Sequence, residues 1–311
     1  MSERIPISAV IPSYNRAAII SKAIESILAQ VYAPFEIIVV DDGSTDNTDQ
    51  VIQKYGKVIR YVYQENAGVS AARNRGMEAA KCEWVAFLDS DDYWTPYHLG
   101  RMANAIFATN GEAALYFADM QRSNDAGPNT HWQLCGFAIS RDFEFRSDAG
   151  DWALMHNQPM MLQSSVIRRR TYLNIGGLPN RLLTREDTLL FFKLALLYPA
   201  CAVSGCGAVM NATDAIRLTQ VYDRSSVVYC YATIALFREL LSSLQHISRE
   251  RRRLLVNCLS ASYFAFSRSL FRQRKYGGTI KNLFISCLTS PMSFAEELAG
   301  TIGRYLSAAT K

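Results

Sequence analysis

The amino-acid sequence predicts an α/β fold, with a mostly parallel β-sheet that has helices on both faces, followed by a C-terminal helical region. Strand-like and helix-like segments alternate over the first ~120 residues, an order typical of βαβ units and parallel sheets. The run 35–40 is apolar without alternation, as expected for a strand covered on both faces. After about Thr213 the chain has a helical pattern to its end.

Three of the expected elements have a local signal for one of their ends. Pro12 ends the first β-branched run, Ser44 or Asp46 can cap the second helix, and Pro96 suits the first turn of the fourth helix. The expected strands are 7–11, 35–40, 58–63, 84–88, 113–120 and 160–167. The expected helices are 17–30, 48–55, 69–80, 96–109 and 185–198. Polar sequence with Gly and Pro between 122 and 149 predicts a loop or a small excursion near the site.

Composition indicates a folded protein of a reducing compartment. The 311 residues are 49% hydrophobic and 20% charged, and the seven cysteines include no Cys-x-x-Cys pair. The four histidines show no metal-ligand spacing. Residues 1–16 lack the apolar core of a secretory signal. The uncharged run 194–213 contains Pro199, Gly205 and Gly207, which favours a buried strand with turns over a membrane span. We therefore expect a cytoplasmic protein.

Three carboxylates follow the apolar strand 84–88 within four positions, at Asp89, Asp91 and Asp92. Carboxylates this close repel one another unless a cation joins them. Mg²⁺ and Mn²⁺ prefer oxygen ligands and need few carboxylates when phosphate oxygens complete the set. Alone, the cluster also fits a solvated acidic turn. However, a second pair, Asp41 and Asp42, ends another strand, and open parallel sheets bind ligands at such strand ends.

Four segments together resemble glycosyltransferase family 2. They read Val-Ile-Pro-Ser-Tyr-Asn at 10–15, Ile-Val-Val-Asp-Asp-Gly-Ser-Thr-Asp at 38–46, Asn-Ala-Gly at 66–68 with Ala-Ala-Arg-Asn-Arg-Gly at 71–76, and Phe-Leu-Asp-Ser-Asp-Asp at 87–92. They occur in the family's order and spacing over about the first hundred residues, and their joint occurrence is far more specific than any one of them. The resemblance implies the Rossmann-like GT-A fold and sugar transfer with inversion.

The resemblance also implies roles for individual residues on the donor side. The loop after the first strand would line the nucleoside pocket, and Asp42 would accept a hydrogen bond from the base, usually uracil. Arg73 would face the nucleotide, Asp89 would reach the ribose, and Asp91 would coordinate the metal on the diphosphate. Asp92 would help through water or cap the segment that follows. The pocket-lining residues of the first loop are Pro12, Tyr14 and Asn15.

Inverting transfer also needs a base for the acceptor hydroxyl. In the family this base is the aspartate of a Glu-Asp pair at the start of a helix, and Thr-Arg-Glu-Asp at 184–187 matches it. Asp187 would be the base and Glu186 a supporting or acceptor-orienting group. Both acids also fit a plain helix N-terminus, which favours negative charge. The chain has Thr188 where the family commonly has an aromatic residue, and Lys193 in place of a later arginine.

These features lead us to expect a metal-assisted inverting glycosyltransferase with Mn²⁺ or Mg²⁺ as cofactor. It would move a sugar from a nucleotide-diphospho-sugar, most simply UDP-linked, to a hydroxyl of a glycan or lipid-linked acceptor in surface polysaccharide synthesis. Residues 1–214 would form the catalytic domain, with a nucleotide-binding half at 1–120 and an acceptor half at 121–214, and residues 215–311 a basic helical region.

Two alternatives remain open at this stage. One is a non-catalytic sugar-nucleotide-binding or scaffold protein of the same fold. The other is a sugar nucleotidyltransferase, although the loop at 12–16 is not the Gly-rich phosphate loop expected there. A dinucleotide dehydrogenase is disfavoured because no Gly-x-Gly-x-x-Gly follows a strand.

The C-terminal third carries all the excess positive charge. Residues 1–214 have 19 basic and 23 acidic residues, whereas residues 215–311 have 14 and 5. Aromatic residues lie between the basic clusters 249–253 and 272–275, at Tyr263, Phe264, Phe266 and Phe271. The tail therefore predicts either contact with an anionic membrane surface, on its inner face, or a helical subdomain with a solvated basic face. No nucleic-acid-binding motif accompanies it, so no nucleic-acid partner is expected.

Overall fold

A computed structural model describes residues 4–122, 130–211, 226–245 and 247–309. The chain forms two compact units. The first consists of Met1–Arg181 with Leu190–Ala215, and the second of Leu182–Leu189 with Ile216–Lys311. The domain boundary expected between 214 and 215 lies outside the described residues.

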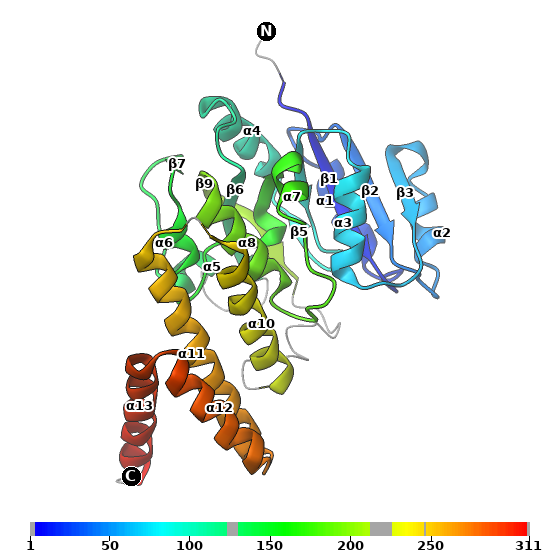
Figure 1. Cartoon of the computed structure of the whole chain (residues 1–311). Helices are drawn as coiled ribbons and strands as arrows, with labels where there is room; N and C mark the ends of the chain where they lie inside the picture. The colour runs from blue at the N-terminus through cyan, green and yellow to red at the C-terminus, as the bar shows by residue number, and fades with distance from the viewer. Residues whose placement is uncertain (1–3, 123–129, 212–225, 246, 310–311) are drawn as a thin grey trace. The chain divides into compact units, whose positions relative to one another are not determined.

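The first unit is built on one mixed β-sheet (Figure 1). In the described part of the chain the sheet has nine strands. Eight of them follow the order β3-β2-β1-β4-β8-β6-β9-β5, and the ninth, β7, pairs with β9. The first four strands are parallel, β8 is antiparallel to both β4 and β6, and β6 is parallel to β9. The strands are β1 (Ile7–Ser13), β2 (Glu36–Asp41), β3 (Ile59–Tyr63), β4 (Trp84–Phe87), β5 (Tyr93–Trp94), β6 (Leu115–Arg122), β7 (Phe143–Arg146), β8 (Ser165–Arg168) and β9 (Ala200–Met210).

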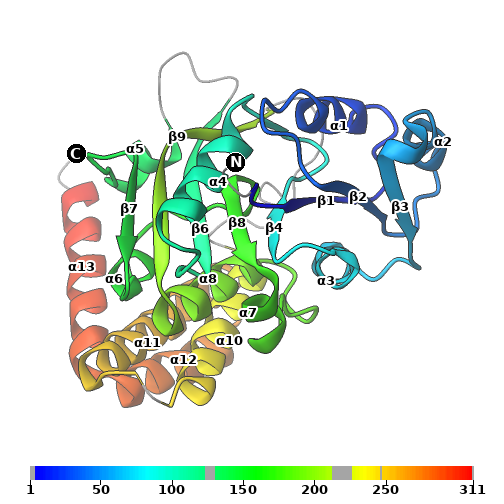
Figure 2. The ribbon, with the colours of Figure 1, turned by 90° about the horizontal axis from the view of Figure 1, so that it is seen from above.

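Helices cover both faces of this sheet, as predicted. Side chains alternate along β1, so Ile7, Ala9 and Ile11 join the apolar cluster that contains α1 and α4, while Val10 faces α3. Figure 2 shows α1 and α3 on opposite sides of β1 and β2. The helices that begin in this unit are α1 (Ile20–Leu28), α2 (Thr48–Gln53), α3 (Val69–Ala79), α4 (His98–Ala108), α5 (His131–Cys135), α6 (Gly150–Ala153) and α7 (Arg169–Asn174).

A glycine permits the close approach of α3 to β1. A Cβ at Gly76 would lie 2.2 Å from Cγ1 of Val10, which is buried and β-branched. Helix α3 therefore lies directly on β1 and holds its side chains close to the ends of the central strands.

The segment expected to be a loop contains short elements. Within the described residues from 130 to 149 it forms α5 and β7, and α6 follows directly. A capping box between Thr130 and Gln133 starts α5. The Phe-Glu-Phe-Arg alternation of β7 is a strand pattern that was too short to stand out in the polar sequence around it.

The strand expected at 160–167 is shorter, because Leu162–Ser164 forms a 3-10 turn and β8 begins only at Ser165. The hydroxyls of Ser164 and Ser165 both donate to the carbonyl of Met161, over 3.3 and 2.7 Å, and such local bonds compete with the ladder of a strand. The strand expected within 194–213 is β9, and residues 212 and 213 of that run lie outside the described residues.

The second unit is helical, in agreement with the expected C-terminal region. It comprises the start of α8 (Glu186–Leu197) and then α10 (Val227–Ser243), α11 (Arg249–Arg272), α12 (Tyr276–Thr289) and α13 (Pro291–Ala309). Ser226 and Ser248 cap α10 and α11 by accepting backbone hydrogen bonds. Among the described residues, no helix has both the length and the apolar character that crossing a bilayer would require.

Candidate active site

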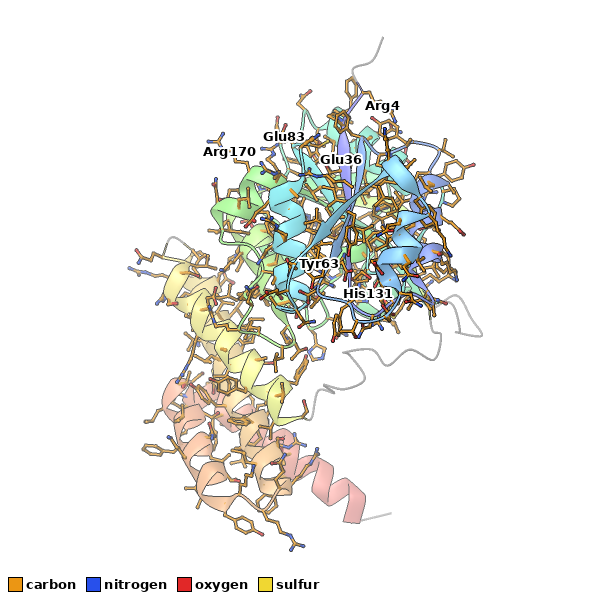
Figure 3. The ribbon with its side chains drawn as sticks, turned by 90° about the vertical axis from the view of Figure 1, so that its right-hand side faces the viewer. Arg4, Glu36, Tyr63, Glu83, His131 and Arg170 are labelled. Atoms are coloured by element: carbon orange, nitrogen blue, oxygen red, sulfur yellow. The ribbon has the colours of Figure 1, made fainter. Side chains whose placement is uncertain are left out.

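The parallel strands end at one edge of the sheet, where most of the predicted site residues lie. In Figure 3 Glu36, at the start of β2, and Glu83, just before β4, lie at one edge, and Tyr63, the last residue of β3, lies at the other. Asp42 and Asp89 follow the ends of β2 and β4. The carboxyl edge of the parallel half therefore gathers the acidic residues, as the strand order predicted.

The loop after β1 is tied to the loop after β2 by Asn15. Its Oδ1 accepts hydrogen bonds from the backbone N–H groups of Thr45 and Asp46, over 2.8 and 3.3 Å, and its own N–H donates to Oγ of Ser44 (2.9 Å). Asn15 has a positive φ of 52°, a conformation that asparagine tolerates better than most residues. Next to it, Tyr14 is 45% exposed, whereas Pro12 is buried within β1. Of the three, Tyr14 offers the most surface to a ligand.

Asp42 is buried and hydrogen-bonded to the segment 64–68. Its carboxylate accepts from Nε2 of Gln64 (2.7 Å) and from the backbone N–H groups of Ala67 (2.9 Å) and Gly68 (2.8 Å). A carboxylate has about four acceptor positions, so three bonds leave one for a further donor. The Asp42 side chain thus fixes the Asn-Ala-Gly turn before α3.

Asp41 has a structural role at a different turn, the one that follows β2. It accepts hydrogen bonds from the hydroxyl of Tyr61 (2.6 Å) and from the backbone N–H of Ser44 (2.9 Å). Burial, together with the neighbouring Asp41 carboxylate, raises the pKa of Tyr61 well above its usual value. The two acids of the pair therefore differ, since Asp41 holds β3 and the turn after β2 while Asp42 holds the next loop.

Asp89 lies between two donors from different parts of the chain. Nη2 of Arg73, on α3, donates to its Oδ1 (2.7 Å), and Nε2 of Gln163 donates to its Oδ2 (2.5 Å). The Arg73 side chain is 7% exposed, so its charge is buried next to Asp89. The sequence analysis did not identify this contact of Gln163, because its partner lies 74 residues earlier in the chain.

Asp89, Asp91 and Asp92 each offer a carboxylate oxygen, and these oxygens lie within 4.8 Å of one another. Asp92 is buried and accepts a hydrogen bond from the backbone N–H of Asn211 (3.1 Å), which follows β9. Asp89 and Asp91 are half-buried. An all-oxygen donor set of this kind suits a hard divalent cation such as Mg²⁺ or Mn²⁺.

Asn74, one residue after Arg73, fastens α3 to the Gly-Gly turn at 176–177. Its side chain donates to the carbonyl of Leu178 (2.8 Å) and accepts from the backbone N–H of Leu178 (3.0 Å) and the hydroxyl of Tyr172 (2.6 Å). The Ala-Ala-Arg-Asn motif therefore supplies both the partner of Asp89 and an anchor for the following segment. Sequence reasoning did not identify this second role.

The predicted base lies in the second unit, at the first turn of α8, which begins at Glu186. Oδ1 of Asp187 accepts from the backbone N–H of Thr188 (2.6 Å). Arg185, just before the helix, has a positive φ of 68°, and its guanidinium packs on the ring of Tyr229 and donates to the Tyr229 hydroxyl. Glu186 and Asp187 therefore stand where the family pattern puts them in a helix, on a segment that Tyr229 holds in place.

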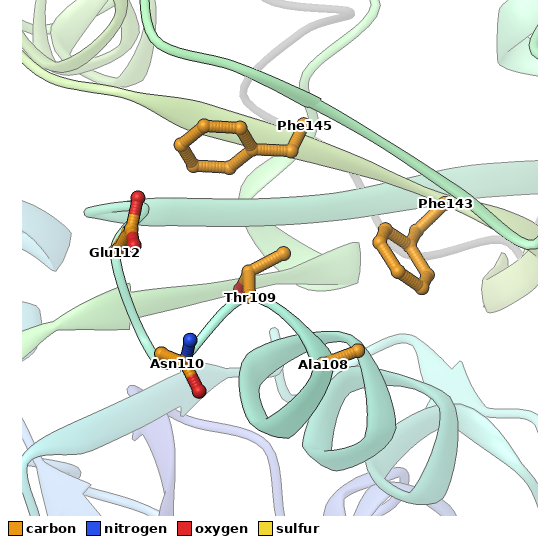
Figure 4. A pocket seen from close by; sticks show the side chains of 6 residues that line it. All are labelled: Ala108, Thr109, Asn110, Glu112, Phe143 and Phe145. Atoms are coloured by element: carbon orange, nitrogen blue, oxygen red, sulfur yellow. The ribbon is translucent and has the colours of Figure 1, made fainter.

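A pocket of about 280 Å³ lies away from these residues, between the end of α4 and β7. Figure 4 shows Phe143 and Phe145 on one side of it and the turn from Ala108 to Glu112 on the other. This turn leads into the start of β6, at the sheet edge opposite the carboxylates, because β6 runs parallel to β4. The pocket contains none of the predicted site residues.

Comparison with known proteins decides the family. A family model described as glycosyl transferase family 2 matches residues 8–173, more than half of the chain. The chain belongs to glycosyltransferase family 2. The matched residues include Asp42, Arg73 and the three aspartates at 89–92, and the match ends before Glu186 and Asp187.

Curated family-2 relatives match a shorter part. An uncharacterized glycosyltransferase of Nostoc sp. is 40% identical over 123 residues, which cover 38% of this chain and 38% of the relative. TuaG of Bacillus subtilis, named for teichuronic acid biosynthesis, is 45% identical over 92 residues, 28% of this chain and 36% of TuaG. The chain thus spans less than two fifths of the length of these two relatives.

Solved structures share the fold over nearly the whole chain. TarS 1-349 of S. aureus, in complex with UDP-GlcNAc, has a TM-score of 0.68 at 20% identity and covers 94% of this chain and 83% of its own. The mannosyltransferase PcManGT of Pyrobaculum calidifontis, in complex with GDP-Man and Mn²⁺, has a TM-score of 0.59 at 17% identity and covers 98% and 81%. At these identities the likeness establishes the GT-A-like fold and no more.

Proposed function

We propose that this protein is an inverting, metal-dependent glycosyltransferase. It moves a sugar from a nucleotide-diphospho-sugar, UDP-linked, onto a hydroxyl of a glycan or lipid-linked acceptor, and it serves the synthesis of a surface polysaccharide. The proposal rests on one observation in this member of glycosyltransferase family 2. The carboxylates of Asp89, Asp91 and Asp92 converge after β4, next to the buried guanidinium group of Arg73.

The donor side of the proposal assigns each acidic residue a task. Asp91 would hold the divalent cation, Asp89 would bind the ribose, and Asp42 would accept a hydrogen bond from the base. Arg73 would keep Asp89 in place and add positive charge near the phosphates. A bound cation would offset the negative charge that develops on the departing diphosphate.

On the acceptor side, Asp187 would take the proton of the attacking hydroxyl, with Glu186 orienting the acceptor. Both acids lie at the first turn of α8, the position that the Glu-Asp pair has in the family, and this supports the assignment.

The choice of donor, cofactor and product draws on the relatives. The solved structures of TarS and PcManGT contain UDP-GlcNAc, or GDP-Man with Mn²⁺, and TuaG is named for teichuronic acid biosynthesis. Nucleotide-diphospho-sugars, a divalent cation and a surface polymer therefore suit this chain as well.

The test is a panel of UDP- and GDP-sugars with Mn²⁺ and candidate hydroxyl acceptors, read out as release of UDP or GDP. We expect one donor to give metal-dependent release that Asp91→Asn abolishes. The matched control Glu112→Gln also replaces a carboxylate by an amide, at an exposed position at the opposite sheet edge, and should retain release.

Two outcomes would contradict the proposal. Binding of a sugar nucleotide without turnover, hydrolysis included, would indicate a non-catalytic binding protein. Release of pyrophosphate from a sugar phosphate and a nucleoside triphosphate would indicate a nucleotidyltransferase instead.

A further inference from the structure

Helix α12 packs with its polar side inward and its large apolar side outward. The buried residues of this helix are Thr279, Asn282 and Ser286. The apolar residues Ile280, Phe284 and Leu288 are instead 68%, 65% and 68% exposed. A surface helix of a soluble domain normally shows the reverse arrangement, with its apolar stripe facing the core.

The contact with α11 fixes this orientation. Oγ of Ser260 donates to the carbonyl of Ser286, and Oγ of Ser286 donates to the carbonyl of Ser260, each over 2.9 Å. Both serines are fully buried. A third bond joins Oγ of Ser290 to Oδ1 of Asn257 (2.9 Å). Because small side chains let the two helices approach closely, α12 could turn its apolar side inward only by breaking these buried hydrogen bonds.

The exposed side of α12 forms a continuous apolar face. Residues four positions apart lie on one side of a helix, and Tyr276, 56% exposed, extends the row by one turn. Tyr276 also packs edge-on against the exposed Phe271, with 5.8 Å between ring centroids. We define the apolar face of α12 as Tyr276, Ile280, Phe284 and Leu288. Figure 1 shows α12 beside α11 in the second unit.

Basic residues lie at the N-terminal end of this apolar face and beside it. Arg272, Arg274 and Lys275 directly precede the helix and Lys281 lies beside Phe284 and Leu288 along it, and all four are exposed. Residues 271–295 contain no Asp or Glu. Exposed apolar side chains are therefore combined with a purely positive charge along this segment.

We propose that the apolar face of α12 and its basic rim dock the protein on the surface of an anionic lipid bilayer. Such a surface offers negative headgroups to the rim and acyl chains to the apolar residues, which is how amphipathic helices bind in the interface plane. The helix has 14 residues and lies along the surface, because a membrane span needs about 20. Docking is independent of the proposed transfer reaction.

Charge disfavours a second copy of the chain as the occupant. A two-fold dimer through this face would bring the same basic rim from both copies together, and like charges across an interface oppose association.

The proposed lipid-facing surface differs from the one that the sequence suggested, which was the aromatic segment between the basic clusters 249–253 and 272–275. Tyr263 and Phe264 of α11 are 5% and 2% exposed, so they pack inside the unit.

The experiment is flotation of the full chain with vesicles of phosphatidylcholine containing phosphatidylglycerol, and with vesicles of phosphatidylcholine alone. We expect binding to the anionic vesicles only. Phe284→Ser should weaken binding at least about tenfold, because it removes a large apolar side chain from the interface. Its matched control is Phe35→Ser, since Phe35 is 64% exposed in the first unit and should leave binding unchanged.

A charge series tests the rim. The triple variant R272Q/K275Q/K281Q should lose roughly a hundredfold in affinity at low salt, at about fivefold per charge. The control K54Q/K57Q/K81Q removes three exposed charges from the first unit and should bind as the wild type does.

Three outcomes would overturn the proposal. The first is absence of the wild type from the floating fraction, and the second is equal loss in a variant and its control. The third is a dimer by light scattering that Phe284→Ser converts to monomer, since the face would then bind a second copy. None of these outcomes depends on sugar transfer.

Discussion

Arg73 and Asp89 form an ion pair of 2.7 Å that joins α3 to the end of β4. The arginine side chain is 7% exposed and the aspartate side chain 21% exposed. The pair therefore links the Ala-Ala-Arg-Asn motif to the carboxylate cluster in the folded protein, although the two lie 16 residues apart in the chain.

Arg73→Met should destabilise the first unit by about 3 kcal/mol, because it leaves Asp89 without its buried counter-charge. The measurement is urea unfolding followed by fluorescence. Arg75→Met is the control on the same helix, since Arg75 is 55% exposed and lies 3.8 Å from Glu78. It should cost less than about 1 kcal/mol. Equal losses would show that the Arg73–Asp89 pair adds nothing beyond a surface contact.

The second prediction concerns the Gly-Gly turn. A Cβ at Gly177 would lie 2.6 Å from Oδ1 of Asn74, whereas a Cβ at Gly176 would have no neighbour within 4 Å. Both glycines have positive φ, so alanine at either costs about 1–2 kcal/mol in backbone strain. Gly177→Ala should cost at least about 1 kcal/mol more than Gly176→Ala, because it also displaces Asn74. Thermal unfolding of the two variants makes the comparison, and equal melting temperatures would exclude the close contact.

Asp187→Asn should lower kcat for transfer by about 10² to 10⁴ and leave the affinity for UDP with Mn²⁺ unchanged, as loss of a general base requires. Glu250→Gln is the control, because Glu250 is also an acid in the first turn of a helix. If Asp187 only favoured the start of α8, the two variants would retain similar activity. Near-normal transfer by Asp187→Asn would refute the assignment as base.

The fourth prediction concerns stability at acidic pH. Burial, with a smaller contribution from the positive charge of Arg101, lowers the pKa of His98 from 6.5 to about 3. Below about pH 6.5 the unfolded chain therefore binds a proton that the folded chain does not, and stability falls by about 1.4 kcal/mol per pH unit until the pH nears the folded pKa.

Replacement of His98 should remove this contribution to the pH dependence. Neither ring nitrogen of His98 has a hydrogen-bond partner, so leucine can replace it without breaking a bond. Urea unfolding at pH 7 and pH 5 should show a loss on acidification that is about 2 kcal/mol smaller in His98→Leu than in the wild type. His156→Gln replaces an exposed histidine and should show the same loss of stability between pH 7 and pH 5 as the wild type. An unchanged loss in His98→Leu would mean that His98 is protonated in the folded protein.

The parallel half of the fold was predictable because its signals are local. Apolar runs such as 35–40 mark buried strands, and strand ends such as Asp42 and Asp89 must share an edge once the strands are parallel. The chemistry that the motifs assign to that edge stays a prediction. The short β7 could not be predicted, because four residues of alternation carry too little pattern.

Contacts between distant residues were beyond the reach of the sequence. Gln163 meets Asp89 only because β8 pairs with β4, and the antiparallel pairing leaves no local signature. The inverted packing of α12 was hidden for a similar reason. No local pattern in the sequence shows that Ser260 of α11 and Ser286 of α12 bond each other, because they lie 26 residues apart in the chain.

Calorimetric titration with UDP and Mn²⁺ is the most direct test of the claim that the aspartates at the end of β4 hold a metal–nucleotide complex. We predict heat of binding for the wild type that depends on the metal, and binding at least about tenfold weaker for Asp91→Asn. Equal binding by Asp91→Asn, or no heat with UDP or any other nucleoside diphosphate, would contradict the account.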